Sequence, residues 1–105
     1  MEKIELIYFQ MISAVGTAKS MYIEAIQFAK MGDFEKAEEC VEEGNEMFIE
    51  GHQAHAKLLQ KEASGEKIEF SLLLIHAEDQ FMVTDSFKIL TLEFIDLYKR
   101  LEVGQ

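Results

Sequence analysis

Apolar residues recur at helical spacing through nearly the whole chain, and only two short stretches interrupt them. The first is Met31-Gly32-Asp33, where Gly32 can close one helix and Asp33 can cap the next. The second is the polar turn at 63–67, and the chain contains no proline. The pattern predicts three helices, at about residues 2–31, 33–63 and 67–102. Short connections make successive helices antiparallel neighbours.

The first two predicted helices each have a single apolar stripe. The first stripe alternates spacings of four and three residues through Ile4, Tyr8, Met11, Val15, Ala18, Tyr22, Ala25 and Ala29. The second follows the same rule through Phe34, Ala37, Val41, Gly44, Phe48, Gly51, His55 and Leu58. Such spacing is typical of helices that pack side by side in a bundle. Gly44 and Gly51 each cost about 1 kcal/mol of helix propensity relative to alanine, which is tolerable where another helix must come close.

The third predicted helix has two adjacent stripes. One comprises Leu73, His76, Gln80, Val83, Phe87, Leu90, Phe94, Leu97 and Leu101. The other comprises Ile68, Leu72, Ile75, Asp79, Met82, Ser86 and Ile89. One stripe suffices for packing against two partner helices, so the wider apolar surface indicates that copies of this helix pack together in an oligomer. A thicker core within one chain is the alternative.

Composition limits the class of protein. The 105 residues fit a single domain over 1–105, and 20 acidic against 10 basic side chains give a net charge of −10. This charge argues against nucleic acid and anionic membrane surfaces as partners, and it suits a basic protein partner or a bound cation. The N-terminus has no basic segment followed by a long apolar run, so we expect a cytoplasmic protein without membrane insertion. Cys40 has acidic neighbours, which make a thiol a poor nucleophile, and we interpret it as structural.

Three polar residues interrupt the apolar pattern of the third helix: His76, Asp79 and Gln80. Their spacing places them on one side of the helix. If copies of this helix meet at a symmetry axis, the Asp79 carboxylates repel one another unless a cation or a proton neutralises them. A hard divalent cation such as Mg²⁺ fits oxygen ligands. The alternative is an Asp79 that is hydrogen-bonded to a neighbouring helix.

His76 allows a structural and a nucleophilic interpretation. A neutral imidazole has a nitrogen that can attack phosphorus, and a rigid helix holds it in place. Gln80, His52 and His55 are the candidate donors to the phosphate oxygens. His52 and His55 lie one helical turn apart, which also permits surface histidines or a weakly indicated zinc site.

The chain also resembles a known family, along nearly its whole length. The stretches concerned are Gly16-Thr17-Ala18-Lys19-Ser20, the hairpin at 29–38, the run at 58–65 and Leu72-Leu73-Leu74-Ile75-His76-Ala77-Glu78-Asp79-Gln80-Phe81-Met82. They are similar to the lactose/cellobiose-type enzyme IIA components of the bacterial phosphoenolpyruvate:sugar phosphotransferase system. The last stretch matches that family's active site, where His-Ala-Gln-Asp-His-Leu-Met is typical.

The resemblance implies a homotrimer of three-helix subunits acting in lactose/cellobiose/chitobiose-type sugar uptake. It implies that His76 receives a phosphoryl group from the histidine phosphocarrier protein and passes it to a cysteine of the IIB component. It further implies that Asp79 lies at the trimer axis and binds a divalent cation. A membrane IIC component then imports the sugar.

Three departures from the family pattern concern the site. Glu78 stands where glutamine is usual, Gln80 where histidine is usual, and His55-Ala56 where Gln-Thr is usual. Glu78 adds negative charge near an incoming phosphate, whereas His55 can restore a donor from the facing helix. These departures leave open a diverged regulatory member of the family. A helical adaptor without chemistry is the other alternative, although the hairpin at 29–37 has no second tetratricopeptide-type copy.

Overall fold

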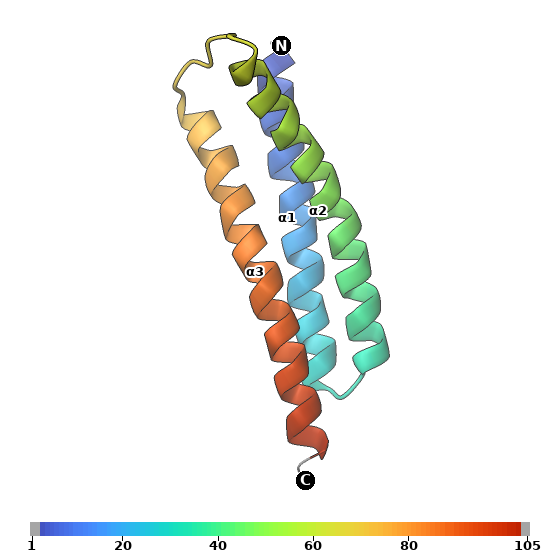
Figure 1. Cartoon of the computed structure of the whole chain (residues 1–105). Helices are drawn as coiled ribbons and strands as arrows, with labels where there is room; N and C mark the ends of the chain where they lie inside the picture. Colours follow the sequence, from blue (N-terminus) through green and yellow to red (C-terminus); the bar gives the residue numbers. More distant parts are fainter. Residues whose placement is uncertain (1–2, 104–105) are drawn as a thin grey trace.

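Three long helices account for most of the chain in the computed structural model, which describes residues 3–103. They are α1 (Lys3–Lys30), α2 (Phe34–Ala63) and α3 (Leu72–Val103). They run side by side in alternating directions and form a rod of 57 × 21 × 18 Å (Figure 1). The all-α, three-helix prediction is confirmed, while the predicted helix start at residue 2 lies outside the described residues. Within residues 3–103, no helix is long and apolar enough to cross a membrane.

The turn between α1 and α2 forms as its residues predict. Gly32 adopts a φ of +81°, which glycine reaches without steric strain. Asp33 caps α2, because its carboxylate accepts a hydrogen bond from the backbone N–H of Lys36 at 3.2 Å. The predicted end of one helix and start of the next are therefore confirmed to within a residue.

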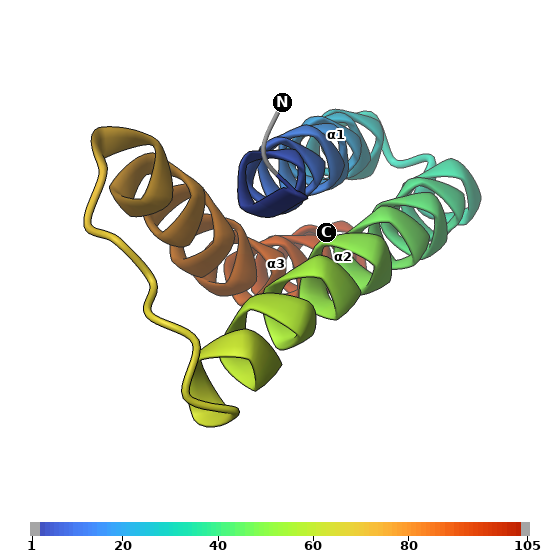
Figure 2. The ribbon, with the colours of Figure 1, turned by 90° about the horizontal axis from the view of Figure 1, so that it is seen from above.

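The connection between α2 and α3 is longer than predicted. α3 begins at Leu72 rather than at 67, because Ser71 caps it: the Ser71 hydroxyl accepts from the N–H of Leu74 at 3.1 Å. Gly65, with a φ of +94°, follows the end of α2. Figure 2 shows the connector spanning from the end of α2 to the separate start of α3. Ile68, predicted in the third helix, lies in this connector and packs against the core.

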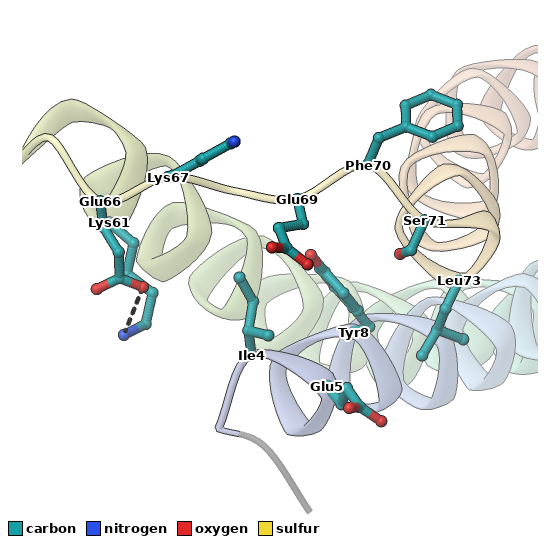
Figure 3. A pocket seen from close by; sticks show the side chains of 10 residues that line it. All are labelled: Ile4, Glu5, Tyr8, Lys61, Glu66, Lys67, Glu69, Phe70, Ser71 and Leu73. Atoms are coloured by element: carbon teal, nitrogen blue, oxygen red, sulfur yellow. Dashed lines mark ion pairs between the residues drawn. The ribbon is translucent and has the colours of Figure 1, made fainter.

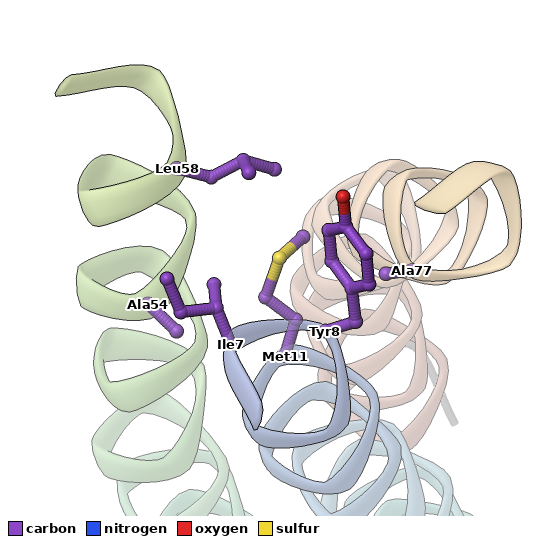
Figure 4. Packing of buried hydrophobic residues seen from close by; sticks show 6 residues of the cluster. All are labelled: Ile7, Tyr8, Met11, Ala54, Leu58 and Ala77. Atoms are coloured by element: carbon purple, nitrogen blue, oxygen red, sulfur yellow. The ribbon is translucent and has the colours of Figure 1, made fainter. Parts of the chain in front are cut away.

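The core follows the α1 stripe. From Tyr8 to Ala29, every residue of that stripe is buried. Figure 4 shows the cluster at one end of the rod, to which α1 contributes the largest side chains; its members are Ile7, Tyr8, Met11, Ala54, Leu58 and Ala77. A second cluster at the other end comprises Ala25, Ala29, Ala37, Cys40, Val41 and Ile95.

The buried row of α3 differs from both predicted stripes. Its members are mostly small: Ala77, Thr84, Thr91 and Ile95. Small side chains let α3 approach α1 closely, and the Thr91 hydroxyl is satisfied by the carbonyl of Phe87 at 2.8 Å. The large apolar residues of the predicted stripes are mostly exposed instead, including Leu72, Met82, Val83, Ile89, Leu90, Phe94, Leu97 and Leu101. The apolar surface of one chain is thus wider than predicted.

The close approach expected at the two glycines of α2 is confirmed. A Cβ at Gly44 would lie 2.6 Å from Cε1 of Tyr22, and one at Gly51 would lie 2.7 Å from Cγ1 of Val15. The ring of Tyr22 is fully buried, and its hydroxyl donates to Oδ1 of Asn45 at 2.7 Å. Neither helix can therefore accept a side chain here without moving.

We expect Gly44→Ala to destabilise the protein in urea denaturation. The methyl group displaces a buried, hydrogen-bonded ring, and such overpacking costs about 1–3 kcal/mol. This exceeds the gain of about 1 kcal/mol in helix propensity. Gly16→Ala is the matched control, since no neighbouring atom lies within 4 Å of its Cβ position, and it should leave stability equal or higher. A Gly44→Ala protein as stable as the Gly16→Ala protein would contradict the close approach.

Candidate functional site

The burial of Ala77 sets the orientation of the polar residues around it. Ala77 is fully buried in the cluster of Figure 4, where it lies next to Tyr8 of α1. Each residue of a helix is turned by about 100° from the one before it. His76 and Glu78 therefore lie on opposite flanks of α3, and Asp79 points away from the core. His76 and Asp79 are both exposed.

The flank that bears His76 also bears Gln80. His76 lies in the second turn of α3, and Gln80 follows one turn later, half-buried. The exposed imidazole is open to a partner protein. The amide of Gln80 can donate a hydrogen bond to an anion held at the ring but cannot become cationic. This flank has a nucleophile and a neutral donor.

The opposite flank is joined to α2 by a histidine–carboxylate pair. Nε2 of His55 lies 2.9 and 3.1 Å from the two carboxylate oxygens of Glu78, so its N–H donates to that carboxylate. The side chain of His55 is 16% exposed and that of Glu78 is 35% exposed. The ring of His55 also stacks on Phe81, with centroids 4.6 Å apart. We call these two residues the His55–Glu78 pair.

Phe81 is the residue on which the α2 side chains converge. Its ring stacks with Phe48 at 5.3 Å and with His52 at 6.0 Å, in addition to His55. Sequence reasoning assigned Phe81 no role, because an apolar residue within an apolar helix gives no signal of its partners. The ring fixes both imidazoles of α2 against α3.

A single chain thus divides the predicted site residues between two flanks. His76 and Gln80 share one flank, and His52 and His55 lie beside Phe81 on the other. Asp79 lies on the outer face between them. Within one chain the structure does not bring His52 or His55 to His76, so their predicted role as donors to its phosphate would need a second copy.

The predicted metal residue is a single exposed carboxylate. Over residues 3–103, no group of three or more His, Cys, Asp or Glu side chains is arranged to hold a metal ion. Mg²⁺ prefers several oxygen ligands, of which one chain provides one at Asp79. The donor chemistry fits a hard cation only if Asp79 residues from several copies converge.

A groove near the start of α3 does not include His76. Its volume is about 990 Å³, and it lies between the N-terminal end of α1 and the connector (Figure 3). Lys67, Glu5 and Glu69 line it, and Lys61 pairs with Glu66 at 3.7 Å. Because charges of both signs are mixed there, the groove has no evident preference for an anion.

A smaller groove of about 420 Å³ separates α2 from the start of α3. Its walls are largely apolar, and Glu78 and Asp79 lie along it; the others are Leu58, Leu59, Glu62, Ile68, Phe70, Leu74 and Ile75. It opens on the flank opposite His76. An apolar groove at this position can accept side chains from another protein surface.

Cys40 is unsuited to nucleophilic chemistry, in accord with its structural interpretation. It is buried in the second core cluster. Burial raises the pKa of its thiol, and the carboxylates of Glu24, Glu43 and Glu39 raise it further. Raising a thiol pKa depletes the reactive thiolate.

Comparisons with known sequences agree on one family. The family described as "PTS system, Lactose/Cellobiose specific IIA subunit" matches residues 6–99. The lactose-specific EIIA component of Staphylococcus aureus is 38% identical over 99 residues, which cover 94% of this chain and 96% of the relative. The corresponding protein of Streptococcus mutans is 37% identical, covering 94% and 95%.

Solved structures agree with the sequence relatives. The crystal structure of the cellobiose-specific enzyme IIA from Bacillus anthracis has a TM-score of 0.97 and 46% identity, covering 100% of this chain and 96% of that one. Solution structures of the IIA(chitobiose)–HPr complex give a TM-score of 0.84 at 28% identity, covering 97% and 99%.

Proposed function

The chain belongs to the lactose/cellobiose-specific IIA family of the phosphotransferase system, as a phosphocarrier in sugar uptake, and on that premise we propose that His76 carries the phosphoryl group. The observation that supports this most directly is the exposure of His76 on a helix whose rotation is fixed by buried Ala77. A carrier must present its ring to two successive partners, so an accessible imidazole on a rigid helix suits it.

The transfer needs no added base. A ring nitrogen of neutral His76 attacks the phosphorus of a phosphohistidine on the donor, and the donor N–P bond breaks as the new N–P bond forms. The electron pair of the broken bond stays on the donor ring, and both rings keep their remaining N–H. The amide of Gln80 donates to a phosphoryl oxygen. The group then passes to a cysteine thiolate of the IIB component.

The donor that fits is the histidine phosphocarrier protein. A relative of the same fold has been solved with HPr, and the net charge of −10 favours a partner that docks through a basic face. Both partners would approach the flank of α3 that bears His76 and Gln80.

The exposed face of α3 supports a homotrimer. Met82 and Ile89 are 65% and 60% exposed, and with Leu72 and Ile75 they share the outer face with Asp79. Leaving several large apolar side chains in water is unfavourable by about 25 cal/mol per Å². Three parallel copies of α3 around an axis would cover this face, with Asp79 from each copy near the axis.

In this trimer, the three Asp79 carboxylates would supply oxygen ligands for a divalent cation such as Mg²⁺. Three Asp79 carboxylates brought together repel one another, and a hard cation with oxygen ligands offsets this repulsion. The role proposed for the metal is to hold the trimer together, apart from the transfer itself.

We expect one phosphoryl group to be added to the wild-type chain by phosphoenolpyruvate, enzyme I and the histidine phosphocarrier protein, as measured by intact mass. His76→Ala should acquire none, because the accepting nitrogen is missing. His52→Ala and His55→Ala should still reach full labelling at long times. Undiminished labelling of His76→Ala would exclude His76 as the acceptor. A wild-type chain that binds the phosphocarrier protein but gains no mass would favour an adaptor.

We expect Ile89→Asp to convert the trimer to monomers in sedimentation velocity. The new carboxylate would be buried three times around the axis without a partner. Ile49→Asp is the matched control, because Ile49 is equally apolar and 55% exposed on α2, and it should remain trimeric. A trimer that persists in Ile89→Asp, or that is lost in Ile49→Asp, would place the interface elsewhere.

We expect removal of divalent cations with EDTA to shift the wild-type protein from trimer towards monomer. Asp79→Asn removes the repulsion that the cation offsets, so its trimer should be insensitive to EDTA. Asp85→Asn, on another face of α3, should behave like the wild type. Equal responses of the wild type and Asp79→Asn would show that Asp79 holds no structural cation.

A further inference from the structure

The His55–Glu78 pair has no part in the transfer described so far. Its two residues lie 23 positions apart in the sequence, on α2 and α3. The structure brings them into contact at 2.9 and 3.1 Å, with His55 held in place by its stacking on Phe81. A carboxylate near a phosphotransfer site repels the incoming phosphoryl group. The contact of Glu78 with His55 therefore affects how strongly that carboxylate opposes the transfer.

In the proposed trimer, the His55–Glu78 pair of one copy lies beside His76 of the neighbouring copy. His76 and Glu78 flank Asp79 on opposite sides of α3. In a ring of three parallel copies, the flank of one α3 that bears His76 faces the flank of the next that bears Glu78, at the same height along the axis. The apolar groove between α2 and α3, along which Glu78 lies, opens on that second flank.

We propose that the His55–Glu78 pair of one copy faces His76 of the next, and that His55 offsets the charge of Glu78 so that a phosphoryl group can be accepted there. This rests on the proposed trimeric phosphocarrier. The N–H of His55 donates to the carboxylate oxygens at 2.9 and 3.1 Å and so stabilises their negative charge. His55 is a positioning residue, since it acts through Glu78 and not on the phosphoryl group.

The test is a double-mutant cycle on the initial rate of phosphoryl transfer from the phosphorylated phosphocarrier protein. His55→Phe keeps a ring to stack on Phe81 but removes the N–H, leaving Glu78 uncompensated. We expect a rate about tenfold below wild type, the effect of one unscreened like charge at close range. Glu78→Gln removes the charge and should transfer at least as fast as wild type.

The double variant decides between charge compensation and a purely structural role. If His55 acts by offsetting Glu78, His55→Phe/Glu78→Gln should return to within about twofold of Glu78→Gln, because there is no charge left to offset. A double variant as slow as His55→Phe alone would overturn the proposal, as would a wild-type rate in His55→Phe. Absence of labelling in the wild type would instead overturn the phosphocarrier function itself.

Mixed trimers test the placement across the subunit boundary. His76→Ala copies accept no phosphoryl group but retain the His55–Glu78 pair. The His76→Ala copies are mixed in large excess with His55→Phe copies and allowed to exchange subunits. They should restore fast labelling of the His55→Phe chain, which is identified by its mass. An excess of the double variant His76→Ala/His55→Phe is the matched control and should restore nothing. No recovery with His76→Ala would overturn the arrangement between copies.

Discussion

The burial of Ala77 against α1 and α2 is the contact on which the arrangement of the site depends. The methyl group of Ala77 lies beside Tyr8 in the core cluster and is fully buried (Figure 4). This contact fixes the rotation of the helix. His76 then lies on one flank, Glu78 on the other and Asp79 on the outer face, so that one packing interaction assigns positions to three side chains of the candidate site. The same rotation turns Leu72 and Ile75 into solvent in the single chain.

The amino-acid sequence predicted the first two helices well, because the residues at helical spacing along each stripe are the ones that pack in the core. The stripes of α1 and α2 are buried or partly buried, Gly32 and Asp33 form the turn between the helices, and Gly44 and Gly51 lie where the helices approach. In α3 the same reasoning selected the wrong face. Its buried row is built from alanine and threonine, which carry little weight in a hydrophobic pattern, while its leucines and phenylalanines point outward. A hydrophobic pattern shows how much apolar surface a helix has. It does not show which part of that surface packs within the chain and which part stays exposed for another copy.

The sequence proposed residues for the candidate site but gave no information on their contacts. His76, Gln80 and Asp79 follow from one helix and from family resemblance. The His55–Glu78 pair joins two helices, and its geometry depends on how Phe81 stacks against α2. Side-chain contacts between helices depend on rotation and on rotamers, neither of which is written in the spacing of residues. The start of α3 was missed for a related reason: the cap at Ser71 is a single local hydrogen bond within a polar connector.

The His76 flank and the outer face of α3 make opposite demands, because one must be accessible and the other must be covered. If His76 carries the phosphoryl group, as proposed, its ring must stay accessible, because donor and acceptor each have to bring a reacting atom into line with its nitrogen. The outer face beside it must be covered, because exposed leucine and isoleucine residues would otherwise promote aggregation. The proposed trimer would reconcile the two, because it would cover the outer face around Asp79 and leave the flank of each His76 at a boundary between copies. In that arrangement a charge on either side of the boundary would act on the phosphoryl group, so a carboxylate at position 78 calls for a partner on α2, and His55 contacts it at 2.9 Å.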